Sequence, residues 1–180
     1  MKNIGWDLDG VLYSWHEVIY EYLKGARRIN GLSYQEYWAN FRTYTTEEEM
    51  KALASQPDFY VKRNINLDIL SMLNRLAEKY ALFYITSRPK NVWYTTENWM
   101  EKNKLPFTEN LITIEGFDKE LHIIKNEIEL YIDDRTDILD RIVPYTDTIL
   151  IRQPYNDHNY LNYNFVDNVL EVEDYIRSKE

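Results

Sequence analysis

The sequence contains no cysteine, which excludes disulfide bonds and zinc sites built on thiolates. It is also short of basic residues, with 21 Lys and Arg against 30 Asp and Glu and a formal net charge of −9. A protein that coats nucleic acid needs a basic face to neutralise phosphates, so we expect no partner of that kind. One small phosphate could still bind if a metal ion and a few local donors overcame the overall negative field.

Long apolar runs are absent too. The N-terminus "MKNIGWDLDG" has no segment that suits a signal peptide, and no window approaches the length of a membrane span. We therefore expect a cytoplasmic protein with no membrane partner. The histidines are scattered without the spacing of a metal site; they are His16, His122 and His158.

Apolar residues make up 44% and aromatic residues 15% of the 180 residues, enough for a packed core in one domain, with or without a modest insertion. From residue 81 onward, short apolar runs alternate with helical patterns, which indicates right-handed crossovers and a parallel sheet covered on both faces. Strands are expected at 4–8, 81–87, 110–116, 129–135 and 147–153, and helices at 15–23, 33–44, 45–55, 67–80, 89–103, 118–128, 136–143 and 169–179.

The helical block after the first strand interrupts this alternation. We interpret it as a small helical cap, residues 16–65, inserted into a doubly wound α/β core formed by residues 1–15 and 66–180. Ser33, either Thr45 or Thr46, and Asn66 are suitable N-cap residues for three of the helices.

Polar residues follow three of the predicted strands. "GWDLDGVLYSW" places Asp7 and Asp9 two positions apart after the first strand, "ITS" ends the second with two hydroxyls, and "YIDD" ends another with two carboxylates. Each pattern alone is commonly a helix cap or a turn. In an open α/β sheet, however, ligands bind at the carboxyl ends of the strands, so their recurrence there favours a functional site.

The chemistry that suits such a set is phosphoryl transfer assisted by a hard cation. Mg²⁺ prefers oxygen ligands and is usually held by one or two carboxylates and a substrate phosphate. One aspartate would attack phosphorus, and a second would give a proton to the leaving oxygen and later take one from water. Hydroxyl groups and a lysine would bind the phosphate oxygens and balance their charge.

These motifs resemble those of the haloacid dehalogenase superfamily. The segments "DLDGV", "FYITS" and "LYIDD" of this sequence match three of the superfamily's motifs, in the family's order. The resemblance implies an HAD-like core with Asp7 as nucleophile and Asp9 as general acid/base, the backbone carbonyl of Asp9 also binding Mg²⁺. It implies that Thr86, with Ser87 beside it, binds phosphate. It further implies an acidic pair around the metal, Asp133 and Asp134, of which we favour Asp134 as the direct ligand.

The third motif of the superfamily is a lysine upstream of the "IDD" strand. Two lysines are available, and most lysines are simply solvated. Lys119 opens the predicted helix and can reach the carboxyl end of the sheet, whereas Lys125 lies in its second half. We therefore assign the motif, and phosphate binding, to Lys119.

Within the superfamily, "DGVL", the helical insertion and "PDFY" are most similar to the 5'(3')-deoxyribonucleotidases. In that family an aromatic residue eight positions after the nucleophile stacks on the nucleobase, and Trp15 has this place here. A tryptophan on a helix face is more often a core residue. Arg88, in "TSRP" where the family often has "TSP", is an extra cation that would bind phosphate in the substrate or pair with an acidic neighbour.

Three functions remain open. The first is a Mg²⁺-dependent nucleotidase acting on nucleoside monophosphates, and the second is a phosphatase for another small phosphate, such as a sugar phosphate or a nucleic-acid end. The third is a non-catalytic phosphate-binding module on the same fold. Asp9 argues against the third, because mere binding needs no proton donor, and against a dehalogenase, because halide departure needs no acid.

Overall fold

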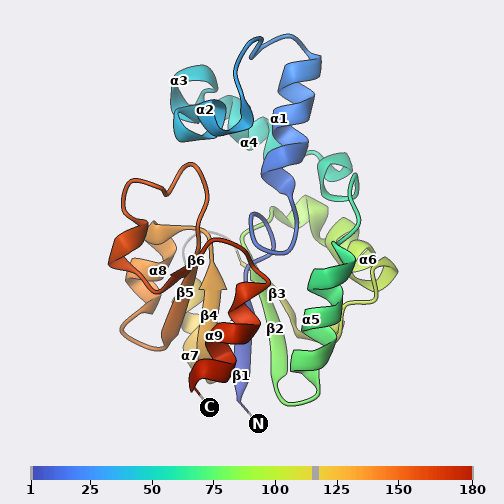
Figure 1. Ribbon diagram of the computed structural model, residues 1–180. Coiled ribbons are helices and arrows are strands. Elements are labelled where there is room, and N and C mark those ends of the chain that lie inside the picture. Colours follow the sequence, from blue (N-terminus) through green and yellow to red (C-terminus); the bar gives the residue numbers. More distant parts are fainter. Residues whose placement is uncertain (1, 115–117, 180) are drawn as a thin grey trace.

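The computed structural model describes residues 2–114 and 118–179 and contains a parallel β-sheet with helices on both faces (Figure 1). In the described residues the sheet has six strands in the order β3-β2-β1-β4-β5-β6. This confirms the predicted doubly wound α/β fold. The strands are β1 (Asn3–Trp6), β2 (Ala81–Thr86), β3 (Leu111–Thr113), β4 (Ile128–Asp133), β5 (Asp147–Ile151) and β6 (Phe165–Val166).

β1 lies at the centre of the sheet, where the order of the strands reverses. The chain adds β2 and β3 on one side of β1 and then β4, β5 and β6 on the other. Trp6, the last residue of β1, is aligned with Tyr84 of β2 and Ile132 of β4. The carboxyl ends of these three strands are therefore neighbours, at the switch point where open α/β sheets bind ligands.

Two apolar layers enclose the sheet because alternate strand residues face opposite sides. One layer joins Tyr84 and Ile132 of the sheet to α5 (Leu67–Ala77), α6 (Trp93–Lys102) and α9 (Glu171–Lys179). The other layer joins the adjacent strand residues Ile85 and Tyr131 to α7 (Lys119–Lys125) and α8 (Thr136–Ile142). Both faces are thus covered, as a parallel sheet requires.

The other helices are α1 (Trp15–Gly25), α2 (Tyr34–Ala39), α3 (Phe41–Tyr44) and α4 (Glu47–Ala54), with 3₁₀ turns η1 (Pro57–Tyr60), η2 (Lys90–Val92), η3 (Thr108–Asn110) and η4 (Tyr160–Asn162). Ser33 and Thr46 form capping boxes, and the Asn66 side chain caps α5, as the sequence predicts. No helix in the described ranges is both long and apolar enough to cross a membrane.

Several predicted boundaries were wrong. The single helix predicted at 33–44 is two helices that meet at Asn40, and the helix predicted at 89–103 begins as the 3₁₀ turn η2. The strand predicted at 110–116 ends at Thr113, and residues 115 and 116 of that prediction lie outside the described residues. β6 was not predicted at all; with only two residues it is too short to show a periodic pattern.

Helices α1 to α4 lie together beyond the carboxyl ends of the strands (Figure 1). Two chain crossings connect them to the sheet, one before α1 and one after η1, and side chains tie the crossings to each other. The Tyr13 hydroxyl donates to the Phe59 carbonyl at 2.5 Å, and Arg63 pairs with Glu17 and Glu21 of α1. The Trp99 indole N–H of α6 donates to the Arg63 carbonyl at 2.8 Å.

Candidate active site

The turn after β1 directs two carboxylates to one side of the chain. Asp7 continues the sheet ladder, because its N–H donates to the Ile132 carbonyl at 2.8 Å. The Leu8 carbonyl then accepts from the N–H groups of Leu12 and Tyr13 at 2.9 and 2.8 Å, which closes a tight loop. Leu8 is buried in the core, so the side chains of Asp7 and Asp9, on either side of it, both reach the cavity at the strand ends.

Gly10 makes this turn possible. Its φ of +86° lies in the left-handed region that residues with a Cβ rarely adopt. A Cβ at this position would also collide with the carboxylate of Asp134. The amide of Gln153, in the loop after β5, donates to the Gly10 carbonyl at 3.0 Å. The turn is therefore fixed both by its own conformation and by a distant loop.

Lys119 joins the ends of β1 and β4. Its ammonium group lies 2.5 Å from Asp7 Oδ1 and 2.7 Å from Asp133 Oδ2, and it also donates to the Tyr131 hydroxyl at 2.7 Å. Burial alone would lower the pKa of Lys119, but the charges of Asp133 and Asp7 outweigh burial and raise it. The side chain is therefore a firmly protonated cation between two carboxylates. Lys125, the alternative for the third motif, is exposed on α7.

The cluster around Lys119 carries more carboxylates than cations. Asp7, Asp133 and Asp134 are all buried, and each offers an oxygen within 4.8 Å of the others. Burial raises the pKa of Asp7 to about 7 against the attraction of Lys119, with Asp133 and Asp9 adding repulsion. Burial and the Asp133 charge raise the pKa of Asp134 well above its usual range. A buried, all-oxygen set with surplus negative charge fits a hard divalent cation such as Mg²⁺.

The two residues of the acidic pair have different partners. Both oxygens of Asp133 are used: Oδ2 accepts from Lys119 and from the Tyr131 hydroxyl at 3.0 Å, and Oδ1 accepts from the Arg135 N–H at 2.9 Å. The Tyr155 hydroxyl donates to Asp134 Oδ2, and the Asn156 amide donates to the Asp134 carbonyl at 2.7 Å. Asp133 therefore orients Lys119, whereas Asp134 Oδ1 accepts no hydrogen bond from the residues that the structure describes.

The end of β2 supplies the hydroxyls. Thr86 is buried and continues the sheet, because its carbonyl accepts from the Ile114 N–H at 2.9 Å. Its hydroxyl lies 3.3 Å from the Arg88 N–H. Ser87 is exposed, and both residues line the same cavity as Asp7 and Lys119. The structure thus brings the hydroxyls to the carboxylates, as the sequence predicts.

Arg88 turns toward Asp9. Its Nη2 lies 2.6 Å from Asp9 Oδ1 and its Nε lies 2.9 Å from Asp9 Oδ2. Of the two roles suggested by the sequence, the structure shows the pairing with an acidic neighbour. Contact between Arg88 and a substrate stays a prediction.

A cavity of about 1220 Å³ extends from the strand ends to the helices beyond them. Its floor holds Asp7, Asp9 and Asp134, the hydroxyls and Lys119, and aromatic side chains form part of its wall. Trp15 belongs to this wall, but only 8% of its surface is exposed. Its ring stacks on Tyr60 with the centroids 6.4 Å apart and makes an edge contact with His16. Trp15 is thus largely a packed residue with one edge at the cavity.

Sequence reasoning missed several residues of this site. The sequence indicates Tyr131 only as part of an apolar strand, and Tyr155 and Asn156 lie in a loop that carries no motif. The sequence indicates only an ordinary helix residue at His16, yet its partly buried ring packs against Trp38 and Tyr155, with ring centroids 4.6 and 4.7 Å apart. Only the position of Tyr131, two residues before Asp133 and so on the same face of the strand, could have indicated its role.

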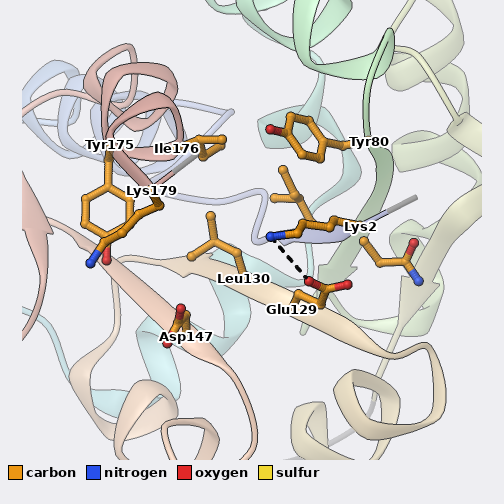
Figure 2. Close-up of a pocket in the computed structure, with 10 residues that line it drawn as sticks. Lys2, Tyr80, Glu129, Leu130, Asp147, Tyr175, Ile176 and Lys179 are labelled. Carbon is orange, nitrogen blue, oxygen red and sulfur yellow. Dashed lines mark ion pairs between the residues drawn. The ribbon is translucent and has the colours of Figure 1, made fainter.

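A second, smaller cavity of about 110 Å³ lies at the opposite end of the sheet (Figure 2). It is formed where β1, β4 and β5 begin and is covered by Tyr175 and Ile176 of α9. Its ion pair, Lys2 with Glu129 at 3.9 Å, joins two exposed side chains. Such a surface pair is worth little energy and offers no buried reactive group, so the candidate active site is the larger cavity.

Three solved structures with the same fold are described as haloacid dehalogenase-like or HAD-superfamily hydrolases. One from Streptococcus pneumoniae is 14% identical, with a TM-score of 0.68 and coverage of 98% of each chain. Another from Xanthomonas campestris is 11% identical, with a TM-score of 0.62 over 99% of this chain and 95% of that one. A third, from Ehrlichia chaffeensis, is 12% identical, with a TM-score of 0.59 over 99% and 98%. At these identities the likeness shows the fold.

The sequence itself matches one protein family over residues 2–180, described as "5' nucleotidase, deoxy (Pyrimidine), cytosolic type C protein". No match is found among curated proteins. The family match covers nearly the whole chain, and the fold agrees with it, as does the resemblance inferred from the motifs. The chain therefore belongs to the cytosolic type C deoxy-5'-nucleotidase family of HAD-fold hydrolases and is a phosphatase.

Proposed function

We propose that this phosphatase is a Mg²⁺-dependent, cytoplasmic 5'-nucleotidase that hydrolyses (deoxy)nucleoside monophosphates through an aspartyl-phosphate intermediate. The observation that carries the proposal is the position of Asp7. It is buried against Lys119 at 2.5 Å, in one cluster with Asp133 and Asp134. Asp9, two residues further on, lines the same cavity.

In the first half-reaction, a carboxylate oxygen of Asp7 attacks phosphorus and the bond from phosphorus to the ester oxygen breaks. Asp9 gives its proton to that oxygen, so the nucleoside leaves as a neutral alcohol. Lys119 and the hydroxyls of Thr86 and Ser87 bind the phosphoryl oxygens. Asp133 contributes by holding Lys119 in place at 2.7 Å.

In the second half-reaction, Asp9 takes a proton from a water molecule, which attacks the phosphorus of the aspartyl phosphate. The bond between phosphorus and the Asp7 oxygen breaks, inorganic phosphate leaves and the carboxylate is restored. Asp9 thus regains the proton that it gave to the leaving oxygen. The same side chain thus serves as acid and then as base.

The residues that would hold Mg²⁺ are Asp7 and Asp134, together with the backbone carbonyl of Asp9. Asp133 is less suited, because both of its oxygens already accept hydrogen bonds. The bound ion would offset the surplus negative charge of the cluster and the charge of the phosphate.

The aromatic wall of the cavity supports a nucleotide as the substrate. Trp15, Trp38, Phe41 and Tyr60 line the part of the cavity formed by α1, α2, α3 and η1. A nucleobase stacked on an aromatic face gains about 1–3 kcal/mol. We propose that the base binds against this wall, with Trp15 among its contacts, while the phosphate lies at Asp7.

A phosphate-release screen tests the proposal. Nucleoside monophosphates and sugar phosphates are compared with Mg²⁺ and with excess chelator. We expect hydrolysis of nucleoside monophosphates with Mg²⁺, loss of activity with chelator, and recovery when Mg²⁺ is restored.

Asp7→Asn is the control for the attacking group, because the amide keeps the shape of the side chain but cannot attack phosphorus. Near wild-type rates for Asp7→Asn would disprove the covalent mechanism, and full activity in chelator would disprove the metal requirement. A clear preference for sugar phosphates would instead favour the second function considered from the sequence, a phosphatase for another small phosphate.

A further inference from the structure

Arg88 makes a two-point ion pair with Asp9. The two nitrogens on one edge of the guanidinium, Nε and Nη2, meet the two carboxylate oxygens at 2.9 and 2.6 Å. The Arg88 side chain has no exposed surface, whereas the Asp9 side chain is 22% exposed and lines the cavity. Asp9 is therefore held from behind by a buried cation while part of its carboxyl group still faces the substrate space.

The guanidinium is itself fixed. Its remaining nitrogen, Nη1, donates to the Thr96 hydroxyl of α6 at 3.2 Å, and that hydroxyl donates to the Val92 carbonyl at 2.9 Å. Its carbon lies 4.5 Å from the centroid of the Tyr60 ring and 5.1 Å from that of Tyr13. Hydrogen bonds in the guanidinium plane and aromatic rings against it leave Arg88 little freedom to turn.

An aspartate carboxyl group otherwise rotates about its last bond, and this matters for a group that must transfer protons in two steps. Proton transfer requires the donor oxygen to be within hydrogen-bonding reach of the leaving oxygen and later of water. A planar guanidinium that bonds through two nitrogens fixes the plane of a carboxylate as well as its position. A single ammonium group fixes only the position.

We propose that Arg88 is a positioning residue that fixes the carboxyl plane of Asp9, so that one edge of Asp9 faces the leaving oxygen and then the attacking water. This inference rests on the acid/base role proposed for Asp9. It assigns Arg88 a function in proton transfer and not in binding the phosphate.

The test compares Arg88→Met and Arg88→Lys with the wild-type enzyme on two substrates, a nucleoside monophosphate and 4-nitrophenyl phosphate. The nucleoside leaving group needs a proton, whereas nitrophenolate departs without one. We expect Arg88→Met to lower kcat for the nucleotide at least tenfold more than kcat for the nitrophenyl ester. Arg88→Lys retains a cation but loses the two-point contact, so its kcat should also fall more for the nucleotide than for the nitrophenyl ester, by a smaller factor.

A double variant separates positioning from a structural effect. If Arg88 acts only through Asp9, adding Arg88→Met to Asp9→Asn should cause little further loss, because the two effects are not additive. Arg75→Met is the matched control: Arg75, an exposed residue of α5, makes the same two-point contact to Glu173, a buried residue of α9, at 3.1 and 2.6 Å, and neither lines the cavity. This control should keep the wild-type ratio between the two substrates.

Three results would overturn the inference. The first is an equal loss of kcat on both substrates for Arg88→Met. The second is a loss of kcat in the double variant that equals the product of the two single losses. The third is wild-type kcat of Arg88→Lys on both esters. If Asp9→Asn itself loses activity equally on both esters, the acid role in the proposed function fails, and the inference fails with it. Circular dichroism and melting temperature show whether each variant folds, and Arg88→Lys decides the test if Arg88→Met does not.

Discussion

Tyr131 shows how a residue in the sheet positions a group above it. Its ring lies over β1 at Gly5, where an added Cβ would come within 2.7 Å of the Tyr131 ring carbon Cδ2. Because Gly5 has no side chain, the ring fits there and its hydroxyl reaches Lys119 at 2.7 Å. The ammonium group of Lys119 is thus located by the sheet as well as by the carboxylates it pairs with.

Replacing Lys119 should therefore affect catalysis far more than replacing the other candidate lysine. We expect Lys119→Ala to lower kcat by roughly 10²–10³-fold, the usual cost of removing one donor to a developing charge. It also leaves two buried carboxylates without their cation. Lys125→Ala, at an exposed position of the same helix, is the control and should stay near the wild-type kcat. A larger loss for Lys125→Ala would mean that the motif lysine is misassigned.

At the scale of elements, the loop after β5 holds the end of β4. Asn156 is buried, and its amide donates to the carbonyls of Asp134 and Ile151 at 2.7 and 2.9 Å. Its side-chain oxygen accepts from the Gln153 N–H at 2.9 Å. One side chain therefore closes its own loop and fixes the backbone of a proposed metal ligand.

Asn156→Ala should lower the free energy of unfolding by about 1–3 kcal/mol, because it leaves buried backbone groups without partners. Urea unfolding monitored by circular dichroism measures this change. The variant should also bind Mg²⁺ more weakly, which calorimetry detects independently of turnover. Asn162→Ala, at an exposed asparagine, is the control. Unchanged stability of Asn156→Ala would show that water replaces these bonds at no cost.

The elements that the sequence predicted well are those with a repeating physical signal. Buried strands read as apolar runs, and parallel strands bring their carboxyl ends together, so Asp7, Thr86 and Asp133 could be grouped without a structure. The division of the helix predicted at 33–44 could not be foreseen, because Asn40 is not a strong helix breaker. Partners brought together by long-range packing, such as Tyr155 with Asp134, leave no local pattern at all.

The boundaries of the predicted helical cap depend on packing that the sequence does not show. A core of 1–15 and 66–180 with a cap of 16–65 stays a prediction, although α1 to α4 do group beyond the strand ends (Figure 1). The partner of Arg88 was one of two alternatives from the sequence. Choosing between them required the fold, because Asp9 and Arg88 are 79 positions apart.

At the scale of the whole molecule, His16 should make stability depend on pH. Burial lowers the pKa of His16 to about 4 from its usual 6.5, with the Asp9 charge opposing this shift and Arg135 adding to it. Between these values the unfolded chain binds a proton that the folded chain does not. The free energy of unfolding should therefore fall as the pH drops from about 6.5 toward 4.

The measurement is urea unfolding at several pH values for the wild-type protein and His16→Phe, whose ring can occupy the same aromatic cluster but cannot be protonated. Carboxylates also titrate in this range, so the informative quantity is the difference between the two proteins. That difference should shift in favour of His16→Phe as the pH falls. His158→Gln, at an exposed histidine, is the control. A difference that does not change with pH would contradict the prediction.

The two chain crossings between the sheet and α1 to α4 also have a mechanical consequence. Two crossings that are bonded to each other restrict rotation of these helices relative to the sheet more than a single crossing would. Tyr13, Arg63 and Trp99 provide these ties, through the Phe59 carbonyl, the α1 glutamates and the Arg63 carbonyl. These contacts join η1 and α1, which carry Tyr60 and Trp15 of the aromatic wall, to α6 and to the turn after β1 that carries Asp7.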